Sequence, residues 1–147
     1  MHLAEHLAND GANVFISDID KSKLENIDNP NINPIDDAFS LECDVFSPCA
    51  LGAIFNESSI KSLNCKIIAG GANNQLQDLS IANALHNRGI IYIPDILINS
   101  GGAIGLTKDL MKRNEVETES DLMNIAYRVR EALTESQEKS ICLQDTI

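Results

Sequence analysis

Asp18 is the first residue in the sequence whose position indicates a chemical role. It follows the apolar stretch NVFIS, residues 13–17, which is typical of a buried strand. A carboxylate at the end of such a strand can accept hydrogen bonds from both hydroxyls of an adenosine ribose and would repel a 2′-phosphate. The alternative is a solvated acid in a turn. Asp20, two residues later, is better placed to cap a following helix.

The segment SPCALG, residues 47–52, places a proline and small side chains directly after a second apolar stretch. Small side chains allow a ligand to approach the backbone closely. Cys49 could act as a nucleophile only beside a base, and the sequence assigns it none. We therefore interpret Cys49 as a small packing residue next to a ligand.

Two further segments carry amides and glycines. GGANNQL, residues 70–76, has two adjacent asparagines whose side chains suit a carboxamide or a carboxylate, although one of them could instead cap a helix. NSGG, residues 99–102, places two glycines in an otherwise helical stretch, where each costs about 1 kcal/mol relative to alanine. This cost indicates either close helix packing or close approach of a ligand.

HLAEH, residues 2–6, matches the HxxEH pattern of some zinc proteases. Two histidines four residues apart can share a metal ion on one helix face, but a third ligand would have to come from elsewhere. We interpret His2 and His6 as exposed helix residues and expect no metal site.

The predicted secondary structure that would position these segments alternates strands with helices. The pattern predicts strands near 13–18, 44–47, 66–69 and 90–93, with helices near 2–10, 20–27, 56–63 and 76–89 and helical, charged sequence from about 106 to 140. Residues 28–37, rich in Pro and Asn, are predicted to be a loop. Such alternation favours an α/β fold in which the four strands lie parallel in one sheet with helices on both faces. Four of these segments, those with Asp18, SPCALG, GGANNQL and NSGG, would then follow the carboxyl ends of strands, where such sheets bind ligands.

Composition narrows the function classes. The 147 residues carry 11 Lys and Arg against 22 Asp and Glu, a net charge of −11, which argues against nucleic acid or an anionic membrane as the main partner. No apolar run reaches the roughly 20 residues of a membrane helix. The four cysteines form no CxxC pair, which indicates reduced thiols in a cytoplasmic protein.

Three stretches, CDVFSPCALGAIFN, KIIAGGANNQL and GIIYIPDILINSGG, resemble the C-terminal domain of the Glu/Leu/Phe/Val dehydrogenases, in order and with similar spacing from residue 1 to about 105. PCALG and ANNQL resemble the leucine, valine and phenylalanine branch. The resemblance implies a Rossmann-like doubly wound parallel sheet. It also implies reversible NAD-dependent oxidative deamination of an L-amino acid to a 2-oxo acid and ammonia.

The resemblance also implies roles for individual residues. Asp18, with Ile19 beside it, would hold the adenosine ribose, and Cys49 and Ala50 would line the nicotinamide. Asn73 would reach the nicotinamide or the substrate, with Asn99 close by. Asp44 and Asp95 would be structural. Gly71 and Ser100 depart from the family pattern, which often has alanine at both positions.

In the family, a strand and a GxGxxG-type loop precede the segment that matches MHLAEHL, after a substrate domain with the catalytic lysine and aspartate. We therefore expect residues 1–105 to be a partial NAD-binding domain without its first strand and glycine-rich loop, followed by a C-terminal helical segment, residues 106–147, packed on it. No lysine occurs in the four segments described above. We expect the chain alone to bind NAD weakly and not to turn over. We also expect the full-length parent to be a homo-oligomer.

A different class remains open at this stage. The chain could be a non-catalytic module that binds a nucleotide or a partner and lacks a catalytic half. A zinc hydrolase built on HLAEH is a third and weaker possibility.

Overall fold

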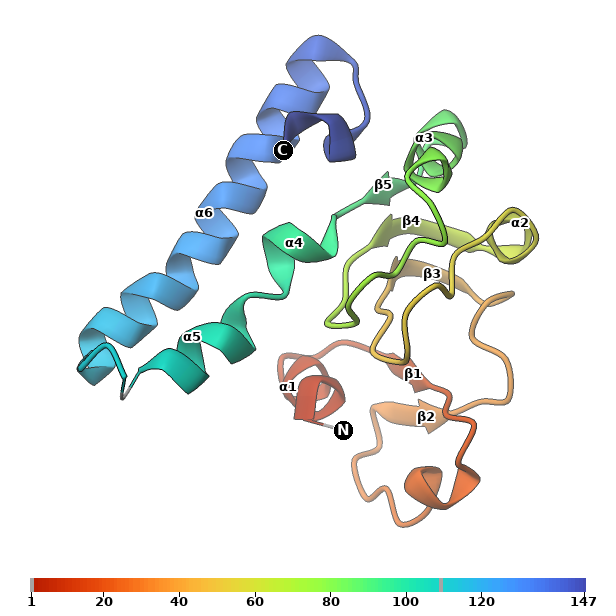
Figure 1. The fold of residues 1–147 in the computed structure, drawn as a ribbon. Helices are drawn as coiled ribbons and strands as arrows, with labels where there is room; N and C mark the ends of the chain where they lie inside the picture. The colour runs from red at the N-terminus through yellow and green to blue at the C-terminus, as the bar shows by residue number, and fades with distance from the viewer. Residues whose placement is uncertain (1, 109) are drawn as a thin grey trace. The chain divides into compact units, whose positions relative to one another are not determined.

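The structure is a computed structural model that describes residues 2–108 and 110–147. The chain forms two compact units, residues 1–41 and 42–147 (Figure 1).

The first unit pairs two short strands beside a helix. Its elements in chain order are α1 (His2–Asn9), β1 (Val14–Ile16), the 3-10 helix η1 (Lys21–Leu24) and β2 (Ile32–Pro34). Strands β1 and β2 are parallel, with Val14 opposite Ile32. The apolar side of α1 supplies the core through Ala4 and Ala8, which pack with Ile32. As expected, Asp20 caps η1, because its side chain accepts a hydrogen bond from the Ser22 backbone N–H.

Strand β2 corrects the prediction of a loop at residues 28–37. The prolines and asparagines of this segment are typical of turns, but Ile32 is buried and the backbone N–H groups of Val14 and Ile35 bond across to Asn31 and Ile16. The prediction of one sheet containing all four strands is also corrected. β1 pairs with β2, and the other three strands form a separate sheet.

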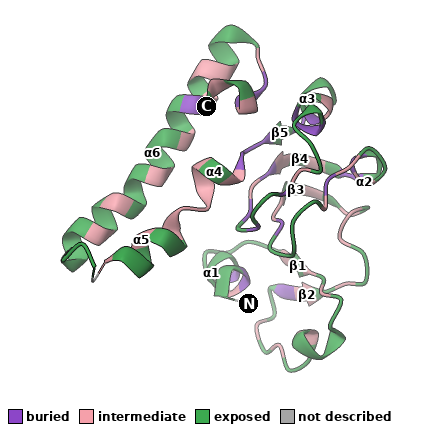
Figure 2. Ribbon diagram, in the orientation of Figure 1, coloured by how far each residue is buried: buried purple, intermediate pink, exposed green. Residues whose placement is uncertain are grey.

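The second unit contains a three-stranded parallel sheet in the order β3-β4-β5. Its elements are β3 (Glu42–Phe46), α2 (Ser59–Ser62), β4 (Asn64–Ile68), α3 (Ser80–Asn87), β5 (Ile91–Tyr92), α4 (Asp95–Ile98), α5 (Gly101–Thr107), α6 (Glu115–Lys139) and η2 (Leu143–Thr146). Helices connect successive strands, as the sequence pattern predicts for an α/β fold. In this unit, Figure 2 shows buried residues on α3 and at and next to β5, whereas in β4 only the last residue, Ile68, is buried.

The core of this unit lies between the sheet and α3. Its largest fully buried apolar side chains include Phe55, Ile68, Ile81 and Leu85. The guanidinium of Arg88, just after α3, donates hydrogen bonds to the carbonyls of Ile60 and Leu63 at the end of α2. Arg88 thus gives the Ile60 carbonyl a second donor beside the Leu63 N–H, and it supplies a donor for the Leu63 carbonyl at the helix end.

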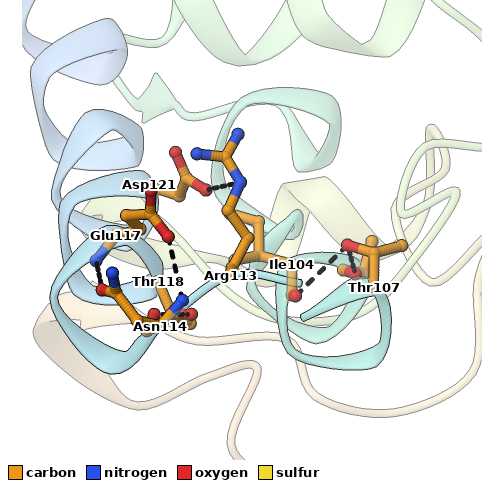
Figure 3. Close-up of polar contacts among 8 residues, drawn as sticks. Ile104, Thr107, Arg113, Asn114, Glu117, Thr118 and Asp121 are labelled. Carbon is orange, nitrogen blue, oxygen red and sulfur yellow. Dashed lines mark hydrogen bonds and ion pairs between the residues drawn. The ribbon is translucent and has the colours of Figure 1, made fainter. Parts of the chain in front are cut away.

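The C-terminal helices form a separate layer of the same unit, in which α4 and α5 contact α6. Asn114 begins α6 with a capping box: its side chain accepts the Glu117 N–H, and the Glu117 carboxylate accepts the Asn114 N–H (Figure 3). Arg113, just before the helix, pairs with Asp121 in its second turn. These contacts fix where the 25-residue helix starts.

Among the described residues, no helix has the length and apolar character needed to cross a membrane.

Candidate functional site

The candidate site of the second unit lies at the carboxyl ends of β3, β4 and β5. The segment after β3 contains Pro48, the segment after β4 contains Asn73, and α4 follows β5 directly. The three segments are joined by backbone hydrogen bonds: Ala69 N–H donates to Phe46 O at 3.0 Å and Ile93 N–H donates to Ile68 O at 2.9 Å. Parallel pairing therefore brings the predicted segments to one edge.

Gly70 allows the first two segments to approach closely. A Cβ atom at this position would lie 2.3 Å from the Pro48 carbonyl oxygen and 2.5 Å from the Pro48 Cδ. The same carbonyl accepts a hydrogen bond from the Ala72 N–H at 2.9 Å. Gly52 is confined in a similar way, since its Cβ would lie 2.8 Å from the Asn73 and Asn74 carbonyl oxygens. Glycine is required here by space.

Asn73 and Asn99 meet through their side chains. The Asn99 Nδ2 donates a hydrogen bond to the Asn73 Oδ1, although the residues are 26 positions apart. Asn73 is exposed and Asn99 is half-buried. The expectation that one of the two asparagines caps a helix is wrong for the helix that follows, because Leu79 directly precedes α3 and makes no side-chain capping hydrogen bond. The Asn73 side chain is instead engaged with Asn99. The pair presents amide donors and acceptors at the sheet edge.

Asp95 holds the segment that carries Asn73. Its Oδ2 accepts the Asn74 backbone N–H at 2.6 Å, and Asn74 has a φ of +49°. This contact agrees with the structural role that the resemblance implies for Asp95. Asp44 is different, since it forms an exposed ion pair with Lys66 at 2.6 Å on the sheet surface.

Cys49 and Ala50 are exposed on the segment after β3. The Cys49 Sγ lies 3.7 Å from the Ser47 hydroxyl. The other thiols are less available, because burial raises the pKa of Cys43 and Cys142 and raises the pKa of Cys65 to about 11. A raised thiol pKa lowers the thiolate fraction, so these three cysteines are poor nucleophiles.

The glycines at 101 and 102 do not serve close helix packing. A Cβ on Gly101 would lie at an ordinary 3.6 Å from the Leu122 side chain, and one on Gly102 would meet no described atom within 4 Å. Beside them, the buried Ser100 hydroxyl has no hydrogen-bond partner among the described residues. Close helix packing therefore does not explain these two glycines.

Asp18 and Ile19 lie in the first unit, directly after β1. The Asp18 Oδ1 accepts the Asp20 N–H at 2.9 Å, and its Oδ2 lies 3.5 Å from the Lys23 ammonium. The side chain of Asp18 remains 35% exposed, and Ile19 is 99% exposed. The backbone contact orients the carboxylate and leaves lone pairs on both oxygens for a ligand.

Sequence reasoning missed Gln75, which is fully buried beneath the Asn73 segment. Its Nε2 donates to the carbonyls of Gly70 and Ala72 at 2.9 and 2.8 Å. A glutamine in a glycine- and asparagine-rich turn is typical of an exposed residue. The local sequence therefore carried no signal of its burial.

Tyr92, at the end of β5, is buried, and the effect of this burial on the pKa of its phenol can be tested. Burial raises the pKa of Tyr92 to about 12, from an ordinary value of 10, and the negative charge of Asp95 adds to the rise. A phenol that ionises later in the folded state stabilises the fold fully below pH 10, and this contribution is lost as the pH rises towards 12. Two pKa units correspond to about 2.7 kcal/mol.

We therefore expect the free energy of unfolding to fall above pH 10, and to fall less in Tyr92→Phe. Urea denaturation of both proteins at several pH values between 9 and 12 measures the difference. Since Cys65 remains in both, the comparison isolates the phenol. Parallel pH profiles for the two proteins would contradict a raised Tyr92 pKa.

Comparison with known proteins gives consistent results. A sequence profile of the family described as glutamate/leucine/phenylalanine/valine dehydrogenase matches residues 2–142. The leucine dehydrogenase of Bacillus subtilis (strain 168) is 37% identical over 144 residues, which cover 95% of this chain and 39% of that enzyme. The leucine dehydrogenase of Thermoactinomyces intermedius is 40% identical over 116 residues, which cover 76% of this chain and 31% of that enzyme.

Solved structures agree. The crystal structure of L-tryptophan dehydrogenase from Nostoc punctiforme superposes with a TM-score of 0.92 at 32% identity, covering 98% of this chain and 44% of that one. The chain thus spans less than half the length of these relatives. The profile match, the identities and the shared fold lead to one conclusion: this chain belongs to the glutamate/leucine/phenylalanine/valine dehydrogenase family of amino-acid oxidoreductases.

Proposed function

We propose that this chain is the NAD-binding part of a leucine dehydrogenase-like enzyme. The enzyme would convert a branched-chain or other apolar L-amino acid, NAD⁺ and water into the 2-oxo acid, ammonium and NADH with release of a proton. The observation that carries the proposal is the Asn73–Asn99 side-chain pair at the carboxyl edge of the sheet. The identities to leucine dehydrogenases support the choice of substrate class.

The residues of the first unit fit the adenosine end of NAD. Asp18 offers two carboxylate oxygens to the ribose hydroxyls, and the Asp20 N–H orients it. A negative charge there would repel the 2′-phosphate of NADP, so we propose NAD as the cofactor. Ile19, nearly fully exposed beside Asp18, offers apolar surface to the adenosine.

The residues of the second unit fit the nicotinamide end. Cys49 and Ala50 are small and exposed, so a planar ring can approach their backbone. Asn73 can hydrogen-bond a carboxamide or the substrate carboxylate, and Asn99 restrains its side chain. When bound, the nicotinamide supplies the acceptor for the hydride.

We assign no proton-transferring residue within this chain. In the proposal, that group belongs to a region equivalent to the part of the relatives that the chain does not span. We further propose a cytoplasmic location and a homo-oligomeric full-length parent, with no nucleic acid or membrane as partner. The net charge of −11 supports the last point.

Binding of NAD by the purified chain tests the proposal. Saturation-transfer NMR detects weak ligands, and we expect contacts to the adenosine and nicotinamide protons of NAD that are stronger than those of NADP. Asp18→Ala should weaken the NAD contacts and narrow the advantage over NADP, because the repelling carboxylate is gone. Asp36→Ala removes an exposed carboxylate of the same unit, paired with Lys21, and should leave both unchanged.

Equal binding of the two cofactors by the unchanged chain, or an Asp18→Ala protein that binds like the parent, would contradict this assignment. We expect no NAD reduction with leucine, valine or phenylalanine. Turnover that disappears in Asn73→Ala would show that the chain carries its own proton-transferring group.

A further inference from the structure

Gln75 is the one fully buried polar side chain among the described residues, and it lies under the segment that carries Asn73. Burying an amide is unfavourable unless its hydrogen bonds are made. The two protons on Nε2 are both used, for Gly70 O at 2.9 Å and Ala72 O at 2.8 Å. One nitrogen therefore joins two points of the turn that precedes Asn73.

The acceptor half of the same amide is not satisfied. The Gln75 Oε1 is buried and has no hydrogen-bond partner among the described residues. An apolar side chain of similar shape would avoid that cost. The glutamine is thus explained by what its nitrogen donates, which is the restraint of the two carbonyls.

The remaining residues of the turn are restrained from other directions. The Ala72 N–H donates to Pro48 O, and the Asn74 N–H donates to the Asp95 carboxylate at 2.6 Å. The Asn74 carbonyl in turn accepts the Ala53 N–H at 2.7 Å. Asn73 lies between these fixed neighbours, with an exposed side chain that accepts from Asn99.

From this geometry we propose that Gln75 is a positioning residue, which sets the place of Asn73 and keeps its side chain in contact with Asn99. This inference rests on the proposed function, because a role of Gln75 in catalysis depends on the role proposed for Asn73. Without the two bonds of Nε2, the backbone before Asn73 is free to relax, while Asp95 still holds the backbone after it. The effect of Gln75 on a bound cofactor would therefore pass through Asn73.

The first measurement uses the unchanged chain. We expect the Gln75 side-chain NH₂ protons to exchange with solvent at least tenfold more slowly than those of Gln77, which is exposed two residues later. This experiment needs no variant to fold. Equal exchange rates would overturn the proposal.

The second measurement compares Gln75→Met with Gln77→Met by NMR of the ¹⁵N-labelled side-chain amides. In Gln75→Met we expect the Asn99 amide signal to shift and its contact with Asn73 to disappear, while far-UV circular dichroism shows a folded chain. Gln77→Met should change neither signal. An unchanged Asn73–Asn99 contact in a folded Gln75→Met protein would overturn the proposal, because a purely structural role changes only the stability.

If Gln75→Met does not fold, Gln75→Glu provides the same comparison. Glutamate has nearly the same shape as glutamine. In its protonated form it offers one O–H donor in place of the two N–H donors of Gln75. We expect the Asn73–Asn99 contact to be weaker than in the unchanged chain. A contact of unchanged strength would contradict the need for both bonds.

Saturation-transfer NMR with NAD separates this inference from the proposed function. No NAD contact in the unchanged chain, with the amide signals as expected, would overturn the function and leave the positioning role of Gln75 intact. NAD contacts that are the same in the unchanged chain and in folded Gln75→Met would support the function and overturn the positioning role.

Discussion

Gly70→Ala is expected to lower the free energy of unfolding by at least about 3 kcal/mol, the upper end of the cost of forcing an extra methyl group into a packed site. The added Cβ would lie 2.3 Å from the Pro48 carbonyl oxygen and 2.5 Å from the Pro48 nitrogen. Both of these atoms belong to the backbone, which cannot move aside by a rotamer change. The segments after β3 and β4 would have to separate, and the Ala72 N–H bond to Pro48 would be lost with them.

Gly71→Ala is the matched control, because it is the same change at the next residue. A Cβ on Gly71 meets no described atom within 4 Å, and Gly71 is not among the residues with positive φ. We expect a change within about 0.5 kcal/mol, since alanine also reduces the freedom of the unfolded chain. Urea denaturation followed by far-UV circular dichroism measures both variants. Equal effects of the two changes would contradict the close approach at Pro48.

The contrast between these two glycines shows what could not be predicted from the sequence. In GGANNQL they are adjacent and chemically identical, and each is compatible with a turn. Only the position of Pro48, 22 residues earlier, distinguishes them, and that contact depends on β3 and β4 being neighbours. The sequence around residue 70 does not reveal a contact with a residue so far away in the chain.

Local pattern did predict the elements that bring the site together. The alternation of apolar stretches with amphipathic ones predicted β3, β4, β5 and α3 in the correct order and in parallel. Parallel strands require that the segments after them share an edge, which is why Asn73 and Asn99 could be expected to be close. The expectation rested on topology.

The prediction of a loop at residues 28–37, where the structure has strand β2, was wrong for a related reason. Its three residues include Asn33 and Pro34, which are depleted in strands, and only Ile32 is buried. Pairing with β1 forms it, through bonds such as Ile35 N–H to Ile16 O at 2.8 Å. Tertiary contact overrides the propensity of a short segment.

Phe55→Ala is expected to produce the largest loss of stability in the second unit, about 3–5 kcal/mol. The ring is 0% exposed, and its centroid lies 5.9 Å from that of Phe46 and 6.5 Å from that of Tyr92, in edge-to-face geometry. Phe46 ends β3 and Tyr92 ends β5. Removing the ring leaves a cavity against the last residues of the two outer strands, whose carboxyl ends form the site, and removes both aromatic contacts.

The backbone of Phe55 is hydrogen-bonded to the segment that carries Asn73, so the loss of the ring is expected to affect the site as well. Its N–H donates to Gln75 O at 3.1 Å, and its carbonyl accepts the Gln77 N–H at 2.9 Å. A shift of Phe55 into the cavity would therefore move the segment that carries Asn73. We expect Phe55→Ala to alter the Asn99 side-chain amide signal even under conditions in which the protein remains folded.

Tyr127→Ala provides the control for Phe55→Ala, because it also replaces a large aromatic side chain of the same unit with alanine. Tyr127 is 60% exposed on α6, and alanine favours the helix, so we expect a loss below about 1 kcal/mol. Urea denaturation of both variants gives the two free energies, and NMR of the ¹⁵N-labelled amides gives the site response. A Phe55→Ala protein no less stable than Tyr127→Ala, or one with an unchanged Asn99 signal, would show that the sheet edge is held independently of this ring.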